Sequence, residues 1–212
     1  MHYAAANTSV PFISPFAHDR VHRIPQDKIM VAPALEGRDR EALINRCISF
    51  LEEVKDMTPS PATESWLNRK YGPGSQLYET LARLVTKGVE DGWAANVAID
   101  GPAYRRSRIA EPSERTLHFS ITAVCMDSTG NHQGHADHRL RGQYHGHPYG
   151  EFNMVVPLNP GAALNGPSGW CGGGWTAPAP GSHHYPEARG GAVIALFFLP
   201  SGRISYHDAP EE

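Results

Sequence analysis

With 212 residues, 40% of them hydrophobic and 19% charged, the chain has the composition of a globular protein and is long enough to bury a sizeable core. Its formal net charge of -3 gives no general attraction to nucleic-acid phosphates or anionic membranes, so neither is an expected partner. No stretch approaches the ~20 apolar residues of a membrane span, and the N-terminus lacks a secretory signal pattern. The three cysteines, Cys47, Cys125 and Cys171, are odd in number and far apart, which favours a reducing cytoplasm.

The first part of the chain combines a proline-interrupted segment with helical patterns. Residues 1–36 contain four prolines and are predicted to form an extended arm. Apolar side chains recur at three- and four-residue spacing between residues 38 and 56, which indicates an amphipathic helix. Ser60-Pro61 and Ser75 are typical starts of two further helices, and Gly92 is a typical stop. We therefore expect residues 37–92 to be a helical segment that packs on the remainder.

After Gly92 the apolar period changes from 3.6 to 2. Strands are predicted at 93–99, 104–109, 117–126, 140–147, 152–158 and 192–199. Because no helices separate them, they indicate an antiparallel sandwich or barrel. The expected fold class is mainly β with N-terminal helices (α+β), with residues 93–212 as the β domain. Arg105, Arg106 and Arg108 on the second strand are interpreted as a solvated edge.

The stretch GQYHGHPYGEFNMVVPL places two imidazoles and a carboxylate, those of His145, His147 and Glu151, within seven residues. If the chain up to His147 is one strand, Arg141, Gln143 and both histidines point to the same face. The turn that follows allows Glu151 to return beside them on the next strand. Such ligand types suit a divalent first-row metal, and an exposed polar strand is the alternative.

A fourth ligand is available in APAPGSHHYPEARGG, which contains His183 and His184. The spacing His-x-His-x3-Glu, followed by Pro-Gly-Ser-x-His, resembles the two metal-binding motifs of the cupins, which are small antiparallel β-barrels with a metal in the barrel mouth. By position, the resemblance implies the ligands His145, His147, Glu151 and His184, with His183 as the rival of His184. The chain departs from the cupin pattern at Arg139, Leu158 and Ala188, where cupins have glycine, glycine and asparagine.

Longer stretches between about residues 70 and 206 resemble the bacterial 4-hydroxylaminobenzoate lyases of nitrobenzoate breakdown. They include YGPGSQLYETLARLVTKGVEDGWAANVAIDGPAYRRSRI, GPSGWCGGGWTAPAPGSHHYPEARGG and LFFLPSGRISY. The resemblance implies a lyase that converts 4-hydroxylaminobenzoate and water into protocatechuate and ammonia, with the metal as a Lewis acid.

Three further residues are predicted to serve this chemistry. Arg141 and Gln143 would contact the substrate, with Arg141 paired to the carboxylate of the aromatic acid. A solvated surface position is the alternative for both residues. His183 would transfer protons if His184 binds the metal, because an imidazole titrates near neutral pH.

Two other functions stay open from the sequence. An iron(II) cupin dioxygenase would use the same ligands and consume oxygen, and a non-catalytic cupin would bind a small aromatic acid without converting it. The ligands do not select among iron, manganese, zinc, nickel and cobalt. We also expect a homodimer, because an N-terminal arm and β-sheet edges suit contacts between subunits.

Overall fold

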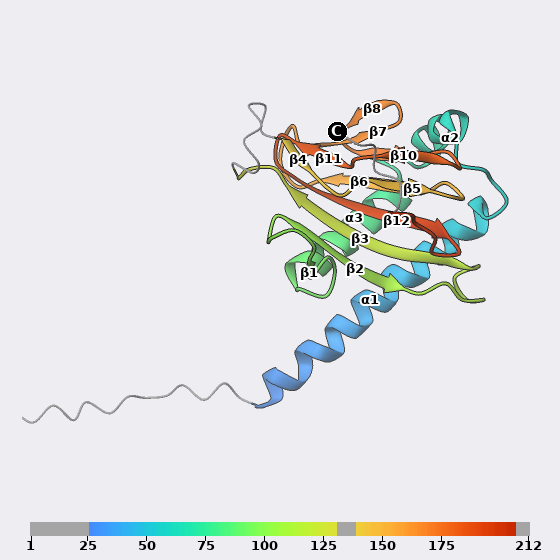
Figure 1. Cartoon of the computed structure of the whole chain (residues 1–212). Helices are drawn as coiled ribbons and strands as arrows, with labels where there is room; N and C mark the ends of the chain where they lie inside the picture. Colours follow the sequence, from blue (N-terminus) through green and yellow to red (C-terminus); the bar gives the residue numbers. More distant parts are fainter. Residues whose placement is uncertain (1–25, 131–138, 207–212) are drawn as a thin grey trace, which may run out of the picture.

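The computed structural model describes residues 26–130 and 139–206, with side chains from residue 37 onward. In these ranges three helices precede twelve strands (Figure 1). The first helix begins at Gln26 and so includes the last residues of the segment predicted as an extended arm. Residues 1–25 of that segment lie outside the described residues. A search of the described part finds no helix with the length and apolar character needed to cross a membrane.

The second and third helices begin where the local sequence predicts, whereas the first begins earlier. They are α1 (Gln26–Val54), α2 (Pro61–Tyr71) and α3 (Gln76–Glu90). The hydroxyl oxygens of Ser60 and Ser75 accept hydrogen bonds from the backbone N–H groups of Thr63 and Tyr78, each at 3.2 Å. Both serines are therefore N-caps. Gly92 follows α3 with a φ of +81°, a left-handed conformation that glycine adopts without strain.

The strands form three antiparallel sheets. They are β1 (Val97–Ala98), β2 (Tyr104–Ala110), β3 (Phe119–Asp127), β4 (Arg139–Arg141), β5 (His145–His147), β6 (Phe152–Pro157), β7 (Ala163–Gly166), β8 (Gly169–Cys171), β9 (Gly174–Thr176), β10 (Ser182–His184), β11 (Glu187–Arg189) and β12 (Ala192–Pro200). Their orders are β1-β2-β3-β12-β6-β9, β10-β5 and β4-β11-β7-β8. This confirms the predicted class of mainly antiparallel β structure with N-terminal helices. Closure into a barrel and the predicted domain boundaries stay predictions.

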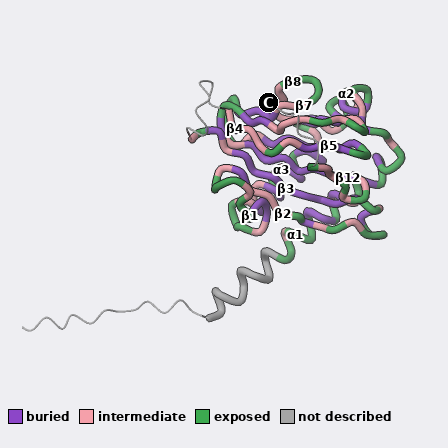
Figure 2. Tube along the Cα trace, viewed as in Figure 1, coloured by how far each residue is buried: buried purple, intermediate pink, exposed green. Residues whose placement is uncertain are grey.

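The two faces of the six-stranded sheet pack against different layers. Along β12, Ile194 and Phe198 belong to the core shared with the helices, whereas Val193 and Ala195 belong to a second core that includes Leu164 of the four-stranded sheet. This is the alternation expected of a strand buried on both faces. Figure 2 shows the central strands as buried and the connecting loops as largely exposed. The second core lies on the side of the sheet that carries the candidate site.

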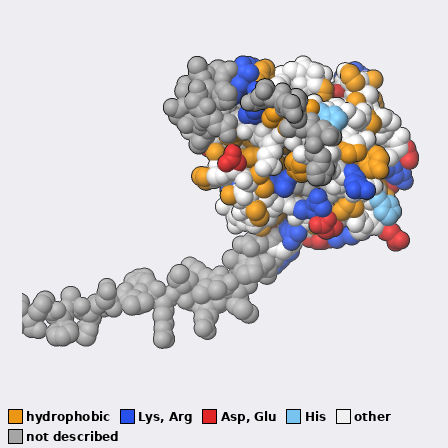
Figure 3. Space-filling model, in the orientation of Figure 1, with side chains coloured by type: hydrophobic (Ala, Val, Ile, Leu, Met, Phe, Trp, Pro, Cys, Tyr) orange, Lys and Arg blue, Asp and Glu red, His pale blue; other side chains and the backbone are white. Residues whose placement is uncertain are grey.

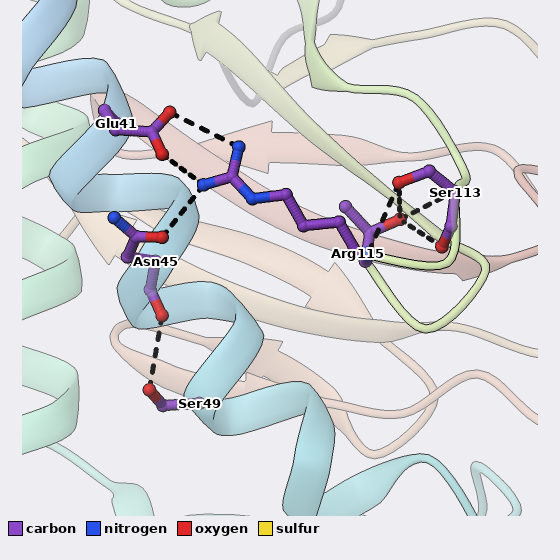
Figure 4. Close-up of polar contacts among 6 residues, drawn as sticks. Glu41, Asn45, Ser49, Ser113 and Arg115 are labelled. Carbon is purple, nitrogen blue, oxygen red and sulfur yellow. Dashed lines mark hydrogen bonds and ion pairs between the residues drawn. The ribbon is translucent and has the colours of Figure 1, made fainter.

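Helix α1 is tied to the loop that joins β2 and β3 by one arginine. The guanidinium of Arg115 forms an ion pair with Glu41 and donates to Oδ1 of Asn45 at 2.9 Å (Figure 4). These side chains are about half exposed, and such pairs contribute ~0–1 kcal/mol each. Lys and Arg side chains also occur beside Asp and Glu side chains on the face seen in Figure 3.

The strand predicted at 140–147 is wrong as a single element, because the chain changes sheets within it. β4 pairs with β11, whereas β5 pairs with β10. The break contains Gly142, whose N–H donates to the carbonyl oxygen of Pro186 at 2.8 Å. A Cβ at Gly142 would lie 2.8 Å from Pro186 and 3.0 Å from the Tyr104 ring, so only glycine fits without a shift. Side-chain alternation therefore does not continue from β4 into β5.

Candidate metal centre

Three histidines converge where β5 pairs with β10. His145 and His147 are two residues apart on β5 and so share a face. His184 lies directly opposite His145 in the antiparallel ladder, which places it on that same face. Nε2 of His184 is 3.2 Å from Nε2 of His145 and 3.3 Å from Nε2 of His147. Three ring nitrogens thus point at one volume of space.

The spacing of these nitrogens fits a metal ion. Zinc–nitrogen bonds of ~2.0–2.1 Å place neighbouring ligand nitrogens about 2.8–3.0 Å apart in octahedral geometry and about 3.3–3.4 Å apart in tetrahedral geometry. The two Nε2–Nε2 separations, 3.2 and 3.3 Å, lie close to the tetrahedral spacing. One ligand atom from each of His145, His147 and His184 lies within 4.8 Å of the others. The donor set therefore suits a divalent first-row metal.

Burial keeps these imidazoles neutral. It lowers the pKa of His147 to about 3 and that of His184 to about 4, and in both cases neighbouring histidines lower the pKa further. Burial also lowers the pKa of His145, although a hydrogen bond to the carbonyl of Gln143 opposes this change. Neutral imidazoles have a lone pair for a metal at neutral pH, so no proton must first be removed.

The backbone of Gln143 selects the ligand nitrogen of His145. Nδ1 of His145 is 2.9 Å from the carbonyl oxygen of Gln143, an acceptor only, so Nδ1 carries the proton and donates. This tautomer leaves the lone pair on Nε2, the atom that faces His184. The side chain of Gln143 is exposed and does not line the cavity described below. Gln143 therefore contacts the site through its backbone carbonyl oxygen.

Glu151 lies immediately before β6 and is 5% exposed. Its Oε2 atom is 3.6 Å from Nδ1 of His147, so it adjoins the three histidines but is not part of the group whose donor atoms lie within 4.8 Å of one another. In the described ranges no Lys or Arg forms an ion pair with this carboxyl group. Burial raises the pKa of Glu151 to about 8. A divalent cation would supply the positive charge that the ionised form needs.

The structure separates His183 from His184. Adjacent residues of a strand point to opposite faces, so His183 of β10 lies opposite to the three converging histidines. It is exposed and stacks on Tyr144, with ring centroids 6.1 Å apart. Of the two histidines, it is therefore His184 that lies beside His145 and His147. His183 lies on the other face of β10, away from them, so its location does not support the proton-transfer role expected for it.

Arg141 also points away from the three histidines. It lies on β4, and its Nε donates to Oε1 of Glu187 on β11 at 3.0 Å. Its guanidinium carbon lies 4.8 Å from the centroid of the Tyr185 ring. The sequence expectation assumed one continuous strand from Arg141 to His145, and the break at Gly142 removes that relationship. Arg141 is not among the residues that line the cavity beside the histidines.

That cavity lies between the six-stranded sheet and the strands that carry the histidines. Its apolar wall is formed by Val124, Met126, Leu164, Ala195, Phe197 and Ile204. Its polar groups come from Tyr104, Arg106, His145, Glu151, Asn153, His184 and Tyr206. An apolar pocket with a few convergent polar groups is typical of a site for a small organic ligand.

Sequence reasoning missed four of these polar residues, Tyr104, Arg106, Asn153 and Tyr206. Arg106 is interpreted from the sequence as part of a solvated edge, although alternation places it on the same face as Tyr104. Tyr206 follows the last strand and belongs to no repeating pattern. Tyr206 reaches the cavity because the preceding residue, Ser205, pairs with Gly146 of β5. The positions of Arg106 and Tyr206 in the cavity cannot be predicted without knowing which strands pair.

Comparisons with known proteins identify relatives of this chain. Residues 45–206 match the family model described as "PnbB: 4-hydroxylaminobenzoate lyase". A 4-hydroxylaminobenzoate lyase of Nocardioides sp. (strain LMS-CY) is 63% identical over 168 residues, which cover 79% of this chain and 95% of the relative. One of Pseudomonas putida is 59% identical over 167 residues, with the same coverage. A solved structure described as "Crystal structures of DMSP lyases RdDddP and RnDddQII" aligns with a TM-score of 0.37 and 14% identity, and covers 82% of this chain and 100% of that one.

Proposed function

The chain belongs to the 4-hydroxylaminobenzoate lyase family, and from this membership we propose that it converts 4-hydroxylaminobenzoate and water into protocatechuate and ammonia. Three buried or half-buried imidazoles converge at the edge of an apolar cavity, and this observation supports placing the reaction there. A benzoate ring needs apolar walls, and the N–O bond that breaks needs an adjacent electrophile.

We propose that His145, His147 and His184, with Glu151 as the fourth ligand, hold one divalent first-row metal ion. Two separations between the Nε2 atoms support this set. The buried carboxyl group of Glu151 also supports it, because it adjoins His147 and forms no ion pair with a Lys or Arg of the described residues. Bound there, such an ion would supply Lewis acidity toward the hydroxylamino oxygen. Its identity among iron, manganese, zinc, nickel and cobalt is open to elemental analysis.

The proposed reaction balances without an external oxidant. The N–O bond of the hydroxylamino group breaks and nitrogen leaves as ammonia, which reduces nitrogen by two electrons. Ring carbons 3 and 4 each end with a hydroxyl group, which oxidises the ring by two electrons. In the net balance, one oxygen comes from the hydroxylamino group and one from water.

The residues of the cavity contribute in two ways. Phe197 and Leu164 offer apolar surface to the ring and exclude water from its faces. Burial raises the pKa of Tyr104 to about 12, so its hydroxyl stays protonated at neutral pH and can donate a hydrogen bond to the substrate. His183, Arg141 and the side chain of Gln143 lie outside the lining of this cavity, and the proposed reaction does not use them.

We also propose that the protein acts in the cytoplasm as a homodimer. The three cysteines are free, which suits a reducing compartment. Light scattering during size-exclusion chromatography would test the dimer, because it measures the mass of the particle directly.

The function is tested by product analysis combined with metal analysis. Purified protein should contain about one divalent ion per chain and should form equal amounts of protocatechuate and ammonia from 4-hydroxylaminobenzoate. Removal of the ion with a chelator should abolish turnover, and its return should restore it. Full activity of metal-free protein would contradict the metal site. Oxygen uptake in step with product, measured with an oxygen electrode, would contradict the lyase and indicate a dioxygenase.

A further inference from the structure

We propose that Arg106 binds the carboxylate of the aromatic acid and so fixes which end of the ring faces the three histidines, an inference that rests on the proposed function. The sequence assigned this role to Arg141 and treated Arg106 as part of a solvated edge. The structure favours the opposite assignment, because Arg106 lines the cavity and Arg141 forms an ion pair with Glu187 outside it.

Arg106 lies in the wall of the cavity beside the histidines. In the register of the six-stranded sheet it pairs with Val124, which pairs with Ala195, and all three line the cavity. It is the single Lys or Arg among the cavity-lining residues that the structure describes. A carboxylate that enters this largely apolar space therefore meets one positive side chain.

The charge of Arg106 has no carboxylate partner in the described part of the chain. Arg108, two residues further on, pairs with Glu111 at 2.7 Å, and Arg141 pairs with Glu187 at 3.0 Å. Nη1 of Arg106 donates to the hydroxyl oxygen of Tyr206 at 2.5 Å. The other N–H groups of its planar fork are available to a carboxylate, which guanidinium binds through two parallel hydrogen bonds.

Tyr206 shows that one aromatic ring is long enough to connect Arg106 with the metal site. Its hydroxyl accepts the bond from Arg106, while its ring centroid lies 6.0 Å from the ring centroid of His145. A benzoate substituted at carbon 4 carries its two functional groups at opposite ends of a ring of the same size. With its carboxylate on Arg106, its hydroxylamino group would point toward the three histidines.

Another polar group in the cavity, the side-chain oxygen of Asn153, lacks a hydrogen-bond partner in the described structure. Asn153 is 6% exposed and lines the cavity, and its Oδ1 atom has no hydrogen-bond partner in the described structure. A buried acceptor without a donor is costly unless a ligand supplies one. The hydroxylamino group has N–H and O–H donors, whereas an ionised carboxylate has none. Arg106 and Asn153 therefore bind opposite ends of the substrate, with the carboxylate at Arg106 and the hydroxylamino group at Asn153.

Binding of an unreactive pair of ligands tests the inference without turnover. Calorimetry on the full-length, metal-loaded protein should show that 4-aminobenzoate binds and that Arg106→Gln weakens this binding roughly 10- to 100-fold. Aniline, which has the same amino group but no carboxylate, should bind the wild type and the variant equally. Arg106→Lys should give an intermediate loss, because it keeps the charge but not the fork.

Arg105→Gln is the matched control. Arg105 is the neighbour on the same strand, faces the other way and contacts Sγ of Cys125 at 3.6 Å, so its variant should bind 4-aminobenzoate like the wild type. Thermal melts of all variants establish that they fold. Equal loss of 4-aminobenzoate and aniline binding in Arg106→Gln, or no loss of either, would overturn the inference.

Kinetics separate this inference from the proposed function. The ratio of kcat/KM for 4-hydroxylaminobenzoate to that for N-phenylhydroxylamine should fall in Arg106→Gln, because only the first substrate has a carboxylate. If this ratio of kcat/KM values fell in Arg141→Gln but stayed unchanged in Arg106→Gln, the inference would be overturned while the lyase activity stands. Wild-type protein that forms no protocatechuate but binds 4-aminobenzoate through Arg106 would overturn the proposed function and leave the inference standing.

Discussion

His184 lies directly opposite His145 in the ladder of β5 and β10, with their Nε2 atoms 3.2 Å apart. Its neighbour His183 points to the other face, where it stacks on Tyr144. Two adjacent residues of one type thus have separate surroundings, and a pair of variants distinguishes them.

His184→Ala should lose most of its metal, because it removes one of three converging nitrogens. We expect His183→Ala to keep the metal content of the wild type. Elemental analysis of both variants after the same purification measures this difference. Metal loss in His183→Ala alone would reverse the assignment made from strand geometry.

The stability of metal-free protein should depend on pH through Glu151. Burial raises its pKa from 4.5 to about 8, so the unfolded chain loses this proton at lower pH than the folded chain. Folding is therefore penalised increasingly as pH rises from about 4.5 to about 8. Glu151→Gln has no such proton, so its free energy of unfolding relative to wild type should rise across this range and level off above it.

Urea unfolding with a chelator present, at several pH values, measures this difference. Both proteins keep the buried histidines, so the comparison isolates the change at Glu151 together with its effect on the adjacent His147. Glu52→Gln, at an exposed glutamate, is the matched surface control for the same substitution. With metal present, the sign should reverse, since glutamine offers no carboxylate to the ion. A pH-independent difference between metal-free Glu151→Gln and wild type would contradict the raised pKa.

Trp175→Phe should destabilise the packing of the helices on the sheet by about 1–3 kcal/mol. Trp175 is 1% exposed, stacks on Phe50 with centroids 4.6 Å apart, and donates from Nε1 to the carbonyl oxygen of Tyr71 at 2.7 Å. Phenylalanine preserves the stacking but leaves this carbonyl without its donor. Urea unfolding provides the measurement. Trp170 is partly exposed, so Trp170→Phe should lower the free energy of unfolding by less than ~0.5 kcal/mol. Equal losses of stability in the two variants would refute this account.

Ser75→Ala should cost about 1 kcal/mol, because it removes the oxygen that accepts the N–H of Tyr78 at the start of α3. Ser49→Ala is the matched change within a helix. Ser49 donates to the carbonyl of Asn45 in the preceding turn of α1 (Figure 4), and alanine is the better helix former there. We expect that variant to unfold within ~0.5 kcal/mol of wild type in urea. A loss at Ser49 as large as that at Ser75 would show that capping is not the cause.

The features that depend on local chemistry were predictable from the sequence. Helix caps such as Ser60 and Ser75 act within three residues, and the spacing of His145 and His147 fixes their shared face without knowledge of the fold. The ambiguity between His183 and His184 required the register of β10 against β5, which no local pattern contains.

The features that depend on strand pairing were not predictable. The strands from β7 to β11 have three or four residues each, too short for alternation to show, and glycine is frequent among them. Arg141 was assigned to the site by an alternation that breaks at Gly142, where a contact with Pro186 from a distant segment decides the path. Arg106 was assigned to an edge because its neighbours across the cavity are far away in sequence.

The pairing of Ser205 with Gly146 has a practical consequence for protein production. Two backbone hydrogen bonds, of 2.7 and 3.0 Å, hold the C-terminal segment against the strand that carries His145 and His147, and Ile204 and Tyr206 line the cavity. A polyhistidine affinity tag fused after this segment would add imidazoles that compete for the metal ion proposed here. Metal analysis and ligand binding should therefore use protein tagged at the N-terminus, or protein from which the tag has been cleaved.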